Sequence, residues 1–479
     1  MHANPTNLLD LPTDLLVRIL AQCESPVDVI SFSSVSRLNA APEASVVEEA
    51  LTLRAREKGY ALPKKNGVST RRRCLFALRR EANPTAMVAA GSAHNVFIDG
   101  EGKLSTCGRS DVIGGPGILG HSESVTQLTT PTRLPAWLDG EVFESVSAGD
   151  NHSIAVTAKG SVWSWGHSGC LGHGSVAEHQ WQPKLIVALA GHAIVSATAG
   201  TLHSLAVTAD GDVWTWGVGG FGQLGHGNHE NRWSPLKIDK AFAGLSVVAV
   251  SAGRAHNLAV TADGGAWSWG SGGCGMLGHG CEENQLYPKR IEAFGAKRVV
   301  SVSSGDNCSF AVTADGTVWS WGIGGDCCLG HGRHEKLRRP SKIEALIGQR
   351  VVAVSTGYAH VLALTADGAV WSWGVGYAGQ LGHGDRENRL QPERVQALAS
   401  CCVVGVAAGT NHSLALGAHG TAWSWGKGEF NRCGTCIGAL YDAPLSIPFH
   451  SLTLSFVCSQ GPIAALATGR ISPTSRFQR

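Results

Sequence analysis

Short apolar runs alternate with glycine-rich turns from residue 87 onward, and their composition is typical of β-strands. Residues 205–208 read Leu-Ala-Val-Thr, and residues 213–216 read Val-Trp-Thr-Trp. The turn between them, residues 209–212, contains Asp-Gly, which is a strong hairpin signal between two β-rich runs. The two tryptophans are two positions apart, so we expect them on one face of their strand. The pattern therefore predicts a β-hairpin over residues 205–216.

This hairpin belongs to a unit that recurs seven times. Each unit reads A-G-x-x-H, a short apolar stretch, T-A-D-G, W-S-W-G and a glycine-rich loop that ends L-G-H-G. The first histidine of the unit falls at positions 94, 152, 203, 256, 360 and 412, and Cys308 takes this place in the fifth unit. A further apolar segment, such as residues 298–303, precedes each A-G. About four strands in about 52 residues make one propeller blade, so we predict an all-β, seven-bladed β-propeller over residues 87–470.

The units resemble the regulator of chromosome condensation repeat family, which forms seven-bladed propellers. The terminal units depart from the pattern, with Leu-Ser-Thr-Cys-Gly at residues 104–108 in place of W-S-W-G and Cys433-Gly434 in place of L-G-H-G. Residues 451–457 and 464–467 look like the opening strands of an eighth unit. We expect this segment to pair with the first blade and close the ring, which removes two open sheet edges. Residues 471–479 are expected to be a disordered tail.

Residues 1–50 have a helical period and lack tryptophan and glycine. The stretch from residue 8 resembles an F-box, quoted as L-x-x-L-P-x-D-L-L-x-x-I-L followed by V-S-R. The resemblance implies that this small α-helical F-box-like domain binds the adaptor subunit of a cullin-based ubiquitin ligase through Leu8, Leu11, Pro12, Leu15, Leu16, Ile19, Leu20 and Val35. The alternative is an amphipathic helical pair packed on the propeller.

A basic segment connects the two predicted domains. Between Arg54 and Arg80 there are ten basic residues and one acidic residue, Glu57. Lysine and arginine runs of this kind can address the nucleus or contact phosphates. The apolar spacing around residues 71–81 favours a helix with a solvated face instead. We therefore interpret residues 51–86 as a basic helical linker.

Composition agrees with a repeated, turn-rich fold. The 479 residues include 62 glycines, about twice the usual share, and 15 tryptophans, twelve of which form six W-x-W pairs. The formal net charge of +2 indicates no global attraction to nucleic acid or membrane. Residues 1–7 have no signal-peptide pattern, so we expect an intracellular protein, in the cytoplasm, the nucleus or both, with its 14 cysteines reduced.

Candidate chemistry is sparse. Twelve histidines recur at two blade positions, but equivalent positions are spread around a ring and do not converge on one metal ion. We expect them to form hydrogen bonds within turns. Phosphate-loop, zinc-protease and serine-hydrolase motifs are missing, and the C-x-x-C of Cys433 and Cys436 stands alone. We predict no enzymatic activity, no cofactor and no metal. The G-W-R-H-T elements of the plant ultraviolet-B photoreceptor, which shares the fold, are also missing.

These observations favour an interaction protein. The F-box-like segment would recruit a ubiquitin-ligase adaptor, and the propeller would capture a substrate protein that the sequence does not identify. Partner contacts are predicted at a basic rim in the loops after L-G-H-G, comprising Arg338, Arg339, Arg386 and Arg389, together with Trp233. The alternative, implied by the repeat family, is a guanine-nucleotide exchange factor for a Ran-like small GTPase or a chromatin-binding propeller.

Overall fold

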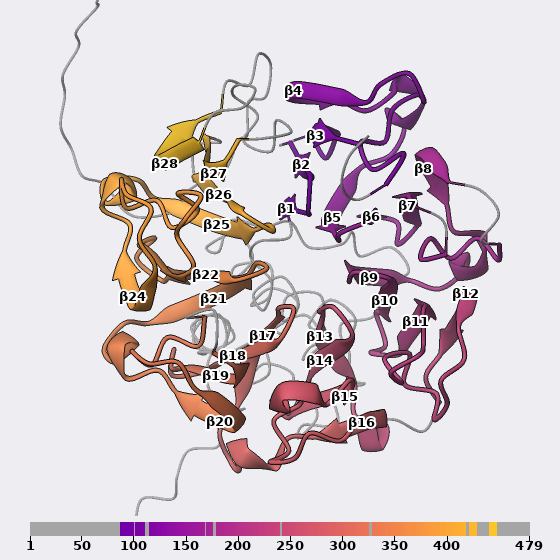
Figure 1. Ribbon diagram of the computed structural model, residues 1–479. Helices are drawn as coiled ribbons and strands as arrows, with labels where there is room; N and C mark the ends of the chain where they lie inside the picture. Colours follow the sequence, from indigo (N-terminus) through magenta and orange to yellow (C-terminus); the bar gives the residue numbers. More distant parts are fainter. Residues whose placement is uncertain are drawn as a thin grey trace, which may run out of the picture.

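Seven four-stranded antiparallel sheets are arranged radially around one centre in the computed structural model (Figure 1). The structure describes residues 87–447 except 100, 111–114, 168, 176–178, 240–241, 325–327, 418–420 and 429–439. Each sheet contains four consecutive strands of the chain, so every repeat builds one complete blade. The predicted all-β, seven-bladed propeller is confirmed. The predicted F-box-like segment, the basic linker, the closing segment 451–467 and the tail lie outside the described residues.

The blades are numbered in chain order from one to seven, and their strands run from the channel outward. Blades one to three contain β1 (Val88–Ala90), β2 (His94–Ile98), β3 (Leu104–Arg109), β4 (Gln127–Arg133), β5 (Phe143–Ala148), β6 (His152–Thr157), β7 (Val162–Gly166), β8 (Gln180–Leu185), β9 (Ile194–Ala199), β10 (His203–Thr208), β11 (Val213–Gly217) and β12 (Arg232–Lys237). Blades four and five contain β13 (Val247–Ala252), β14 (His256–Thr261), β15 (Ala266–Gly270), β16 (Gln285–Arg290), β17 (Val299–Ser304), β18 (Cys308–Thr313), β19 (Val318–Ile323) and β20 (Lys336–Lys342). Blades six and seven contain β21 (Val351–Thr356), β22 (His360–Thr365), β23 (Val370–Gly374), β24 (Arg389–Arg394), β25 (Val403–Ala408), β26 (His412–Gly417), β27 (Ala422–Lys427) and β28 (Leu440–Ser446).

Short 3-10 helices are the other regular elements of the described chain. Six of them follow an outer strand and lead into the next blade: η2 (Ala136–Leu138), η3 (Val187–Leu189), η4 (Phe242–Gly244), η6 (Glu292–Phe294), η7 (Glu344–Leu346) and η8 (Gln396–Leu398). The seventh, η5 (Gly273–Gly275), lies in the loop between β15 and β16. Within the described residues, no helix is long and apolar enough to cross a membrane.

The predicted hairpin is present between β10 and β11, where Val207 pairs with Val213. Gly211 has a φ of 92° in its turn, a backbone conformation that glycine adopts without steric cost. The same register places His203 opposite Gly217 at the other end of the hairpin. The Asp-Gly signal therefore identified the turn correctly.

The hydrophobic core lies between blades. The second tryptophan of each pair is fully buried, and its indole Nε1 donates to a backbone carbonyl of the preceding blade at 2.7–3.0 Å. Trp216, for example, packs with Ile154, Val156 and Ile186 of blade two. In blade one the equivalent position is Cys107, which is also fully buried. Each W-x-W pair therefore fastens its blade to the one before it.

The ring closes by contact between blades seven and one. The Thr410 amide donates to the Gly91 carbonyl at 3.4 Å, and His412 Nε2 lies 2.7 Å from Asn95 Oδ1. The first and last sheets already have four strands each from their own repeats. Within the described residues, the first sheet thus needs no strand from the predicted closing segment to match the other blades.

Candidate protein-interaction face

Two sets of loops open on the same face of the ring. The A-G-x-x turn joins the first and second strands of a blade, and the L-G-H-G loop joins the third and fourth. Because the second strand begins opposite the end of the third, as in the pairing of His203 with Gly217, both loops emerge at one end of the blade. We call this end of the propeller the loop face.

The histidines of A-G-x-x-H bond between blades rather than within turns, which corrects the prediction. In six blades the Nε2 atom lies 2.6–2.9 Å from a serine hydroxyl or asparagine oxygen of the following blade. Burial lowers the pKa of His94, His152, His256 and His360 to about 3, and that of His203 to about 4. These imidazoles are therefore neutral at physiological pH, and their Nε2 atoms form the contacts between blades.

The L-G-H-G histidines follow the prediction of local bonds. In blades two to six, the Nε2 atom lies 2.9–3.1 Å from a serine or threonine hydroxyl of the same blade. Within the described part of the chain, no group of three or more His, Cys, Asp or Glu side chains is placed to hold a metal ion. Both histidine sets therefore have assigned structural roles.

The contact between blades five and six lacks this imidazole. Cys308 occupies the histidine position, and Val361 occupies the acceptor position on β22; both side chains are buried. Compared with the other six contacts, both positions of this contact between blades carry an apolar side chain in place of a polar one. An isolated histidine opposite valine would leave a buried ring nitrogen without an acceptor.

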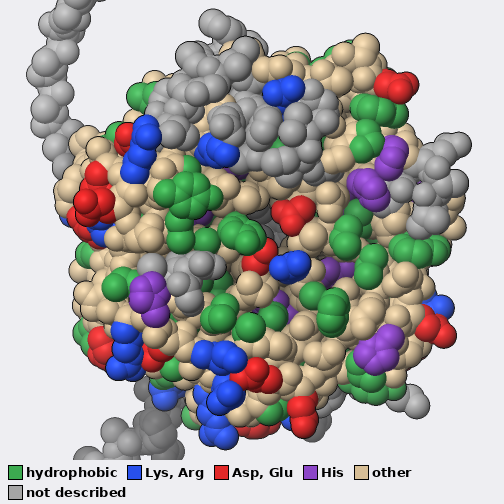
Figure 2. All heavy atoms as spheres, in the orientation of Figure 1, with side chains coloured by type: hydrophobic (Ala, Val, Ile, Leu, Met, Phe, Trp, Pro, Cys, Tyr) green, Lys and Arg blue, Asp and Glu red, His purple; other side chains and the backbone are tan. Residues whose placement is uncertain are grey.

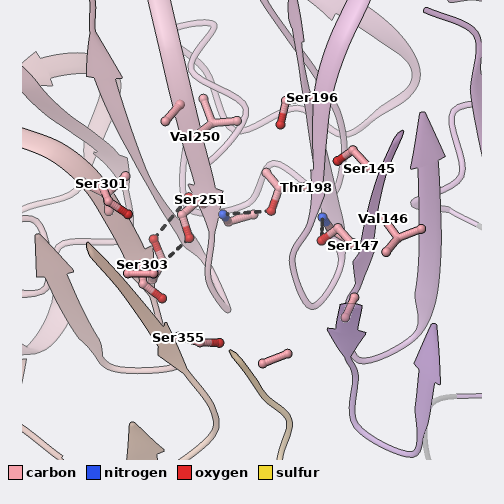
Figure 3. Close-up of a pocket in the computed structure, with 18 of the residues that line it drawn as sticks. Ser145, Val146, Ser147, Ser196, Thr198, Val250, Ser251, Ser301, Ser303 and Ser355 are labelled. Carbon is pink, nitrogen blue, oxygen red and sulfur yellow. Dashed lines mark hydrogen bonds between the residues drawn. The ribbon is translucent and has the colours of Figure 1, made fainter. Parts of the chain in front are cut away.

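The first strands of the blades line a polar channel of about 220 Å³ (Figure 3). Hydroxyl groups form a ladder around it: in five successive blade contacts, a serine or threonine hydroxyl accepts a hydrogen bond from a backbone amide of the next blade. One rung joins Ser147 to the Ala199 amide at 3.0 Å. These five channel hydroxyl groups therefore hold neighbouring blades together.

The channel opens on the loop face into a mouth of about 90 Å³, lined by A-G-x-x turns of all seven blades. Acidic and basic side chains lie at this central opening, with hydrophobic side chains around them (Figure 2). Thr201 donates to the Asp150 carboxylate at 2.8 Å, whereas no donor among the described residues bonds to Asp306. Burial and the nearby Asp150 raise the pKa of Asp306 to about 6, against the opposing effect of Arg254. Asp150 thus takes part in a contact between blades two and three, whereas the side chains of Arg254 and Asp306 form no hydrogen bond or ion pair among the described residues.

Large apolar side chains are also exposed on the loop face. Tyr358, 52% exposed, lines the mouth directly. Leu202, Phe221 and Tyr377 belong to loops of the same face and are 38%, 52% and 58% exposed. Exposed aromatic groups beside charged ones are typical of protein-binding surfaces.

The predicted basic rim lies farther out, on and before the outer strands β20 and β24. Arg338 pairs with Glu282 at 2.7 Å, and Arg386 pairs with Asp442 at 2.9 Å. Arg389 is only 21% exposed and contacts three carboxylates at 2.6–3.7 Å. Arg339 lies beside Gly280 of blade four. Acidic partners in the protein itself thus offset three of these four positive charges.

Trp233 is half-buried in β12, where its backbone carbonyl accepts from the Gly174 amide at 2.9 Å. Neither Trp233 nor the four arginines lines the mouth. The mouth residues Asp150, Arg254, Asp306 and Tyr358 were missed by the sequence reasoning. Their signal was the position after A-G, which varies among the blades although the preceding glycine and, in six blades, the histidine two positions later recur.

The comparisons with known proteins identify a family. Residues 59–399 match the RCC1-like domain, and residues 403–434 match the regulator of chromosome condensation (RCC1) repeat. The chain is 36% identical over 307 residues to the ultraviolet-B receptor UVR8 of Arabidopsis thaliana, covering 64% of this chain and 69% of the receptor. It is 38% identical over 343 residues to the human E3 ubiquitin-protein ligase HERC2, covering 70% of this chain but 7% of HERC2. The fold is similar to that of Prp20p from Saccharomyces cerevisiae, with a TM-score of 0.65 and 23% identity over 78% of this chain and 89% of Prp20p. The binding properties of Prp20p to Gsp1p and histones have been described.

Proposed function

The chain belongs to the RCC1-like family, and from this premise we propose that it is a protein-interaction adaptor whose loop face captures a partner protein. The observation that carries the proposal is the mouth, where Asp150, Arg254 and Asp306 lie beside the exposed ring of Tyr358. The blades are joined by the tryptophan, histidine and hydroxyl contacts, and Asp150 adds one between blades two and three, which leaves Arg254, Asp306 and Tyr358 for binding. The protein itself would form and break no covalent bond.

The finer proposal is that of a substrate receptor of an SCF-type, cullin-based ubiquitin ligase. The F-box-like stretch between Leu8 and Arg37 would bind the ligase adaptor, and the propeller would bind the substrate. The similarity to a region of HERC2 supports an association of such propellers with ubiquitin ligation in one relative. Residues 1–86 lie outside the described structure, so this step depends on their sequence pattern.

Purified full-length chain and a purified ligase adaptor subunit test this step. We expect a one-to-one complex on size-exclusion chromatography, and loss of that complex in the double variant Leu15→Asp, Ile19→Asp. Val187→Asp is the matched control, because this apolar side chain is 72% exposed on the propeller, outside the F-box-like stretch. No complex with the wild-type chain, or equal binding by all three proteins, would refute the receptor role.

The alternative is a guanine-nucleotide exchange factor for a Ran-like GTPase or a chromatin-binding propeller. The likeness to Prp20p supports a shared fold, and fold alone does not confer an activity. Release of a fluorescent nucleotide from a purified Ran-type GTPase would decide this alternative. Acceleration by micromolar propeller would establish it, and an unchanged release rate would remove it.

A further inference from the structure

The mouth of the channel is built from the same repeat position in every blade. The residue after A-G lines it in blades two to seven: Asp150, Thr201, Arg254, Asp306, Tyr358 and Thr410. The glycine before this position and, in six blades, the histidine two positions after it are constrained by packing. A Cβ added at Gly149 would lie 2.3 Å from the Gly200 carbonyl oxygen, and the following histidines bond to the next blade. Variation at the mouth position, between a constrained glycine and a constrained histidine, indicates side chains that the fold leaves to binding.

Charge at the mouth is unbalanced toward the negative. Asp150 and Asp306 come from blades two and five, and Arg254 comes from blade four. Among the described residues, Arg254 forms no ion pair. The Asp150 carboxylate accepts a hydrogen bond from the Thr201 hydroxyl. Asp306 is half-buried and has no hydrogen-bond donor among the described residues. A buried carboxylate in this condition gains most from a cation with N–H donors.

An apolar border lies next to these carboxylates. The Tyr358 ring lines the mouth and is half-exposed, and a cation over such a ring is attracted to its π face. The opening of about 90 Å³ is several times the ~10–15 Å³ needed to hold one water. Lysine and arginine combine a charged head with an apolar stem that packs on aromatic surface. Their chemistry fits this combination of carboxylates and tyrosine.

We propose that the mouth receives a lysine or arginine side chain carried by a segment of the captured protein. The inference rests on the proposed function only in assigning that segment to the captured partner. An acidic side chain would meet two carboxylates here, and most of the arginines on the outer rim are already paired with acids. A bare divalent ion would meet Arg254 beside its two carboxylates.

The probe is the peptide acetyl-Gly-Leu-Arg-Leu-Gly-amide, compared with the same peptide carrying citrulline in place of arginine. Citrulline has nearly the same shape but no charge. Isothermal titration of the full-length chain should show binding of the arginine peptide at least about tenfold tighter than that of the citrulline peptide. Equal affinity for the two peptides, or tighter binding of a glutamate peptide, would overturn the proposal.

Three variants locate the site. Asp306→Asn should weaken binding of the arginine peptide by about tenfold, whereas Glu344→Gln, which removes an exposed carboxylate from η7, should leave it unchanged. Arg254→Gln should strengthen binding, because it removes the cation beside the pocket. Thermal unfolding of each variant checks the fold. Should Asp306→Asn fail to fold, an Arg254→Gln affinity at or below that of the wild type would overturn the proposal by itself.

The two proposals fail separately. If the arginine peptide binds at the mouth but the ligase adaptor does not bind the full-length chain, the receptor role is wrong and the mouth assignment stands. If the adaptor binds and the peptide shows no preference for arginine over citrulline, the mouth assignment is wrong and the receptor role stands.

Discussion

The contact between blades five and six offers a direct test of how the ring is held together. At the other contacts, a buried histidine bonds to a serine or asparagine of the next blade; His256 and Ser309 are 2.9 Å apart, for example. Cys308 and Val361 replace both groups at the fifth contact. We therefore predict that Cys308→His and Val361→Ser are each destabilising alone and compensate each other when combined.

The magnitude follows from hydrogen-bond satisfaction. Cys308→His alone buries an imidazole nitrogen opposite the Val361 methyl groups, which costs about 1–3 kcal/mol. Val361→Ser alone loses buried methyl groups without gaining the histidine partner, at a cost of about 1–3 kcal/mol. The imidazole introduced at position 308 should fit. Gly305 lies three positions before Cys308, as Gly357 lies three positions before His360, and glycine at this position permits the close approach of the imidazole in the other blades. The double variant should recover about 1–2 kcal/mol through coupling.

Equilibrium unfolding in guanidinium chloride, followed by tryptophan fluorescence, measures the four free energies of the cycle. The reciprocal cycle at an intact rung, His256→Cys with Ser309→Val, is the matched control and should show coupling of the same sign. Additive effects in both cycles, with coupling below about 0.5 kcal/mol, would refute the role assigned to the histidine rungs.

Three further predictions follow from the described contacts. The pKa values of five buried histidines are lowered from 6.5 to about 3 to 4, so the unfolded chain binds more protons than the folded chain below pH 6.5. The histidine contribution to the free energy of unfolding should be fully present above pH 6.5 and should fall on acidification by about 1.4 kcal/mol per pH unit for each histidine. Unfolding curves that are unchanged between pH 7 and 5 would contradict this prediction. Trp321→Phe removes the donor to the Met276 carbonyl at 2.8 Å and should cost about 2 kcal/mol in denaturant unfolding; a loss below about 0.5 kcal/mol would count against the indole rung. Gly219→Ala places a Cβ 2.1 Å from the Glu230 carbonyl oxygen and should lower the melting temperature. The control Gly220→Ala places a Cβ with nothing within 4 Å and should leave the melting temperature unchanged. Equal melting temperatures of the two variants would contradict the loop geometry.

The fold could be predicted from the sequence because every blade repeats the same local signals. One Asp-Gly turn and one W-x-W strand are weak evidence alone, but the whole unit recurs seven times at a nearly constant spacing, with W-x-W in six copies, and this recurrence specifies a ring. The direction of the histidine bonds could not be predicted. His152 and Ser204 are 52 residues apart, and their 2.7 Å contact depends on the angle between neighbouring blades.

The binding surface was harder to predict for a physical reason. Arg338 and Arg386 pair with Glu282 and Asp442, each 56 positions away in the sequence, and these pairs form only in the folded ring. The partners of Arg389 lie within four positions of it and could have been recognised in the sequence. Asp150 and Asp306 are 156 positions apart and meet only because the ring brings equivalent turns to one mouth. A comparison of the repeats with one another at the position after A-G would have singled them out.

The proposed function requires that the N-terminal segment and the propeller bind two different proteins. Quantitative mass spectrometry would compare the proteins that copurify with the wild-type chain, with Leu15→Asp, Ile19→Asp and with Asp306→Asn. We expect the Leu15→Asp, Ile19→Asp variant to lose the ligase adaptor and cullin but keep the captured substrate, and Asp306→Asn to do the reverse. Loss of the same proteins in both variants, or of none in either, would contradict it.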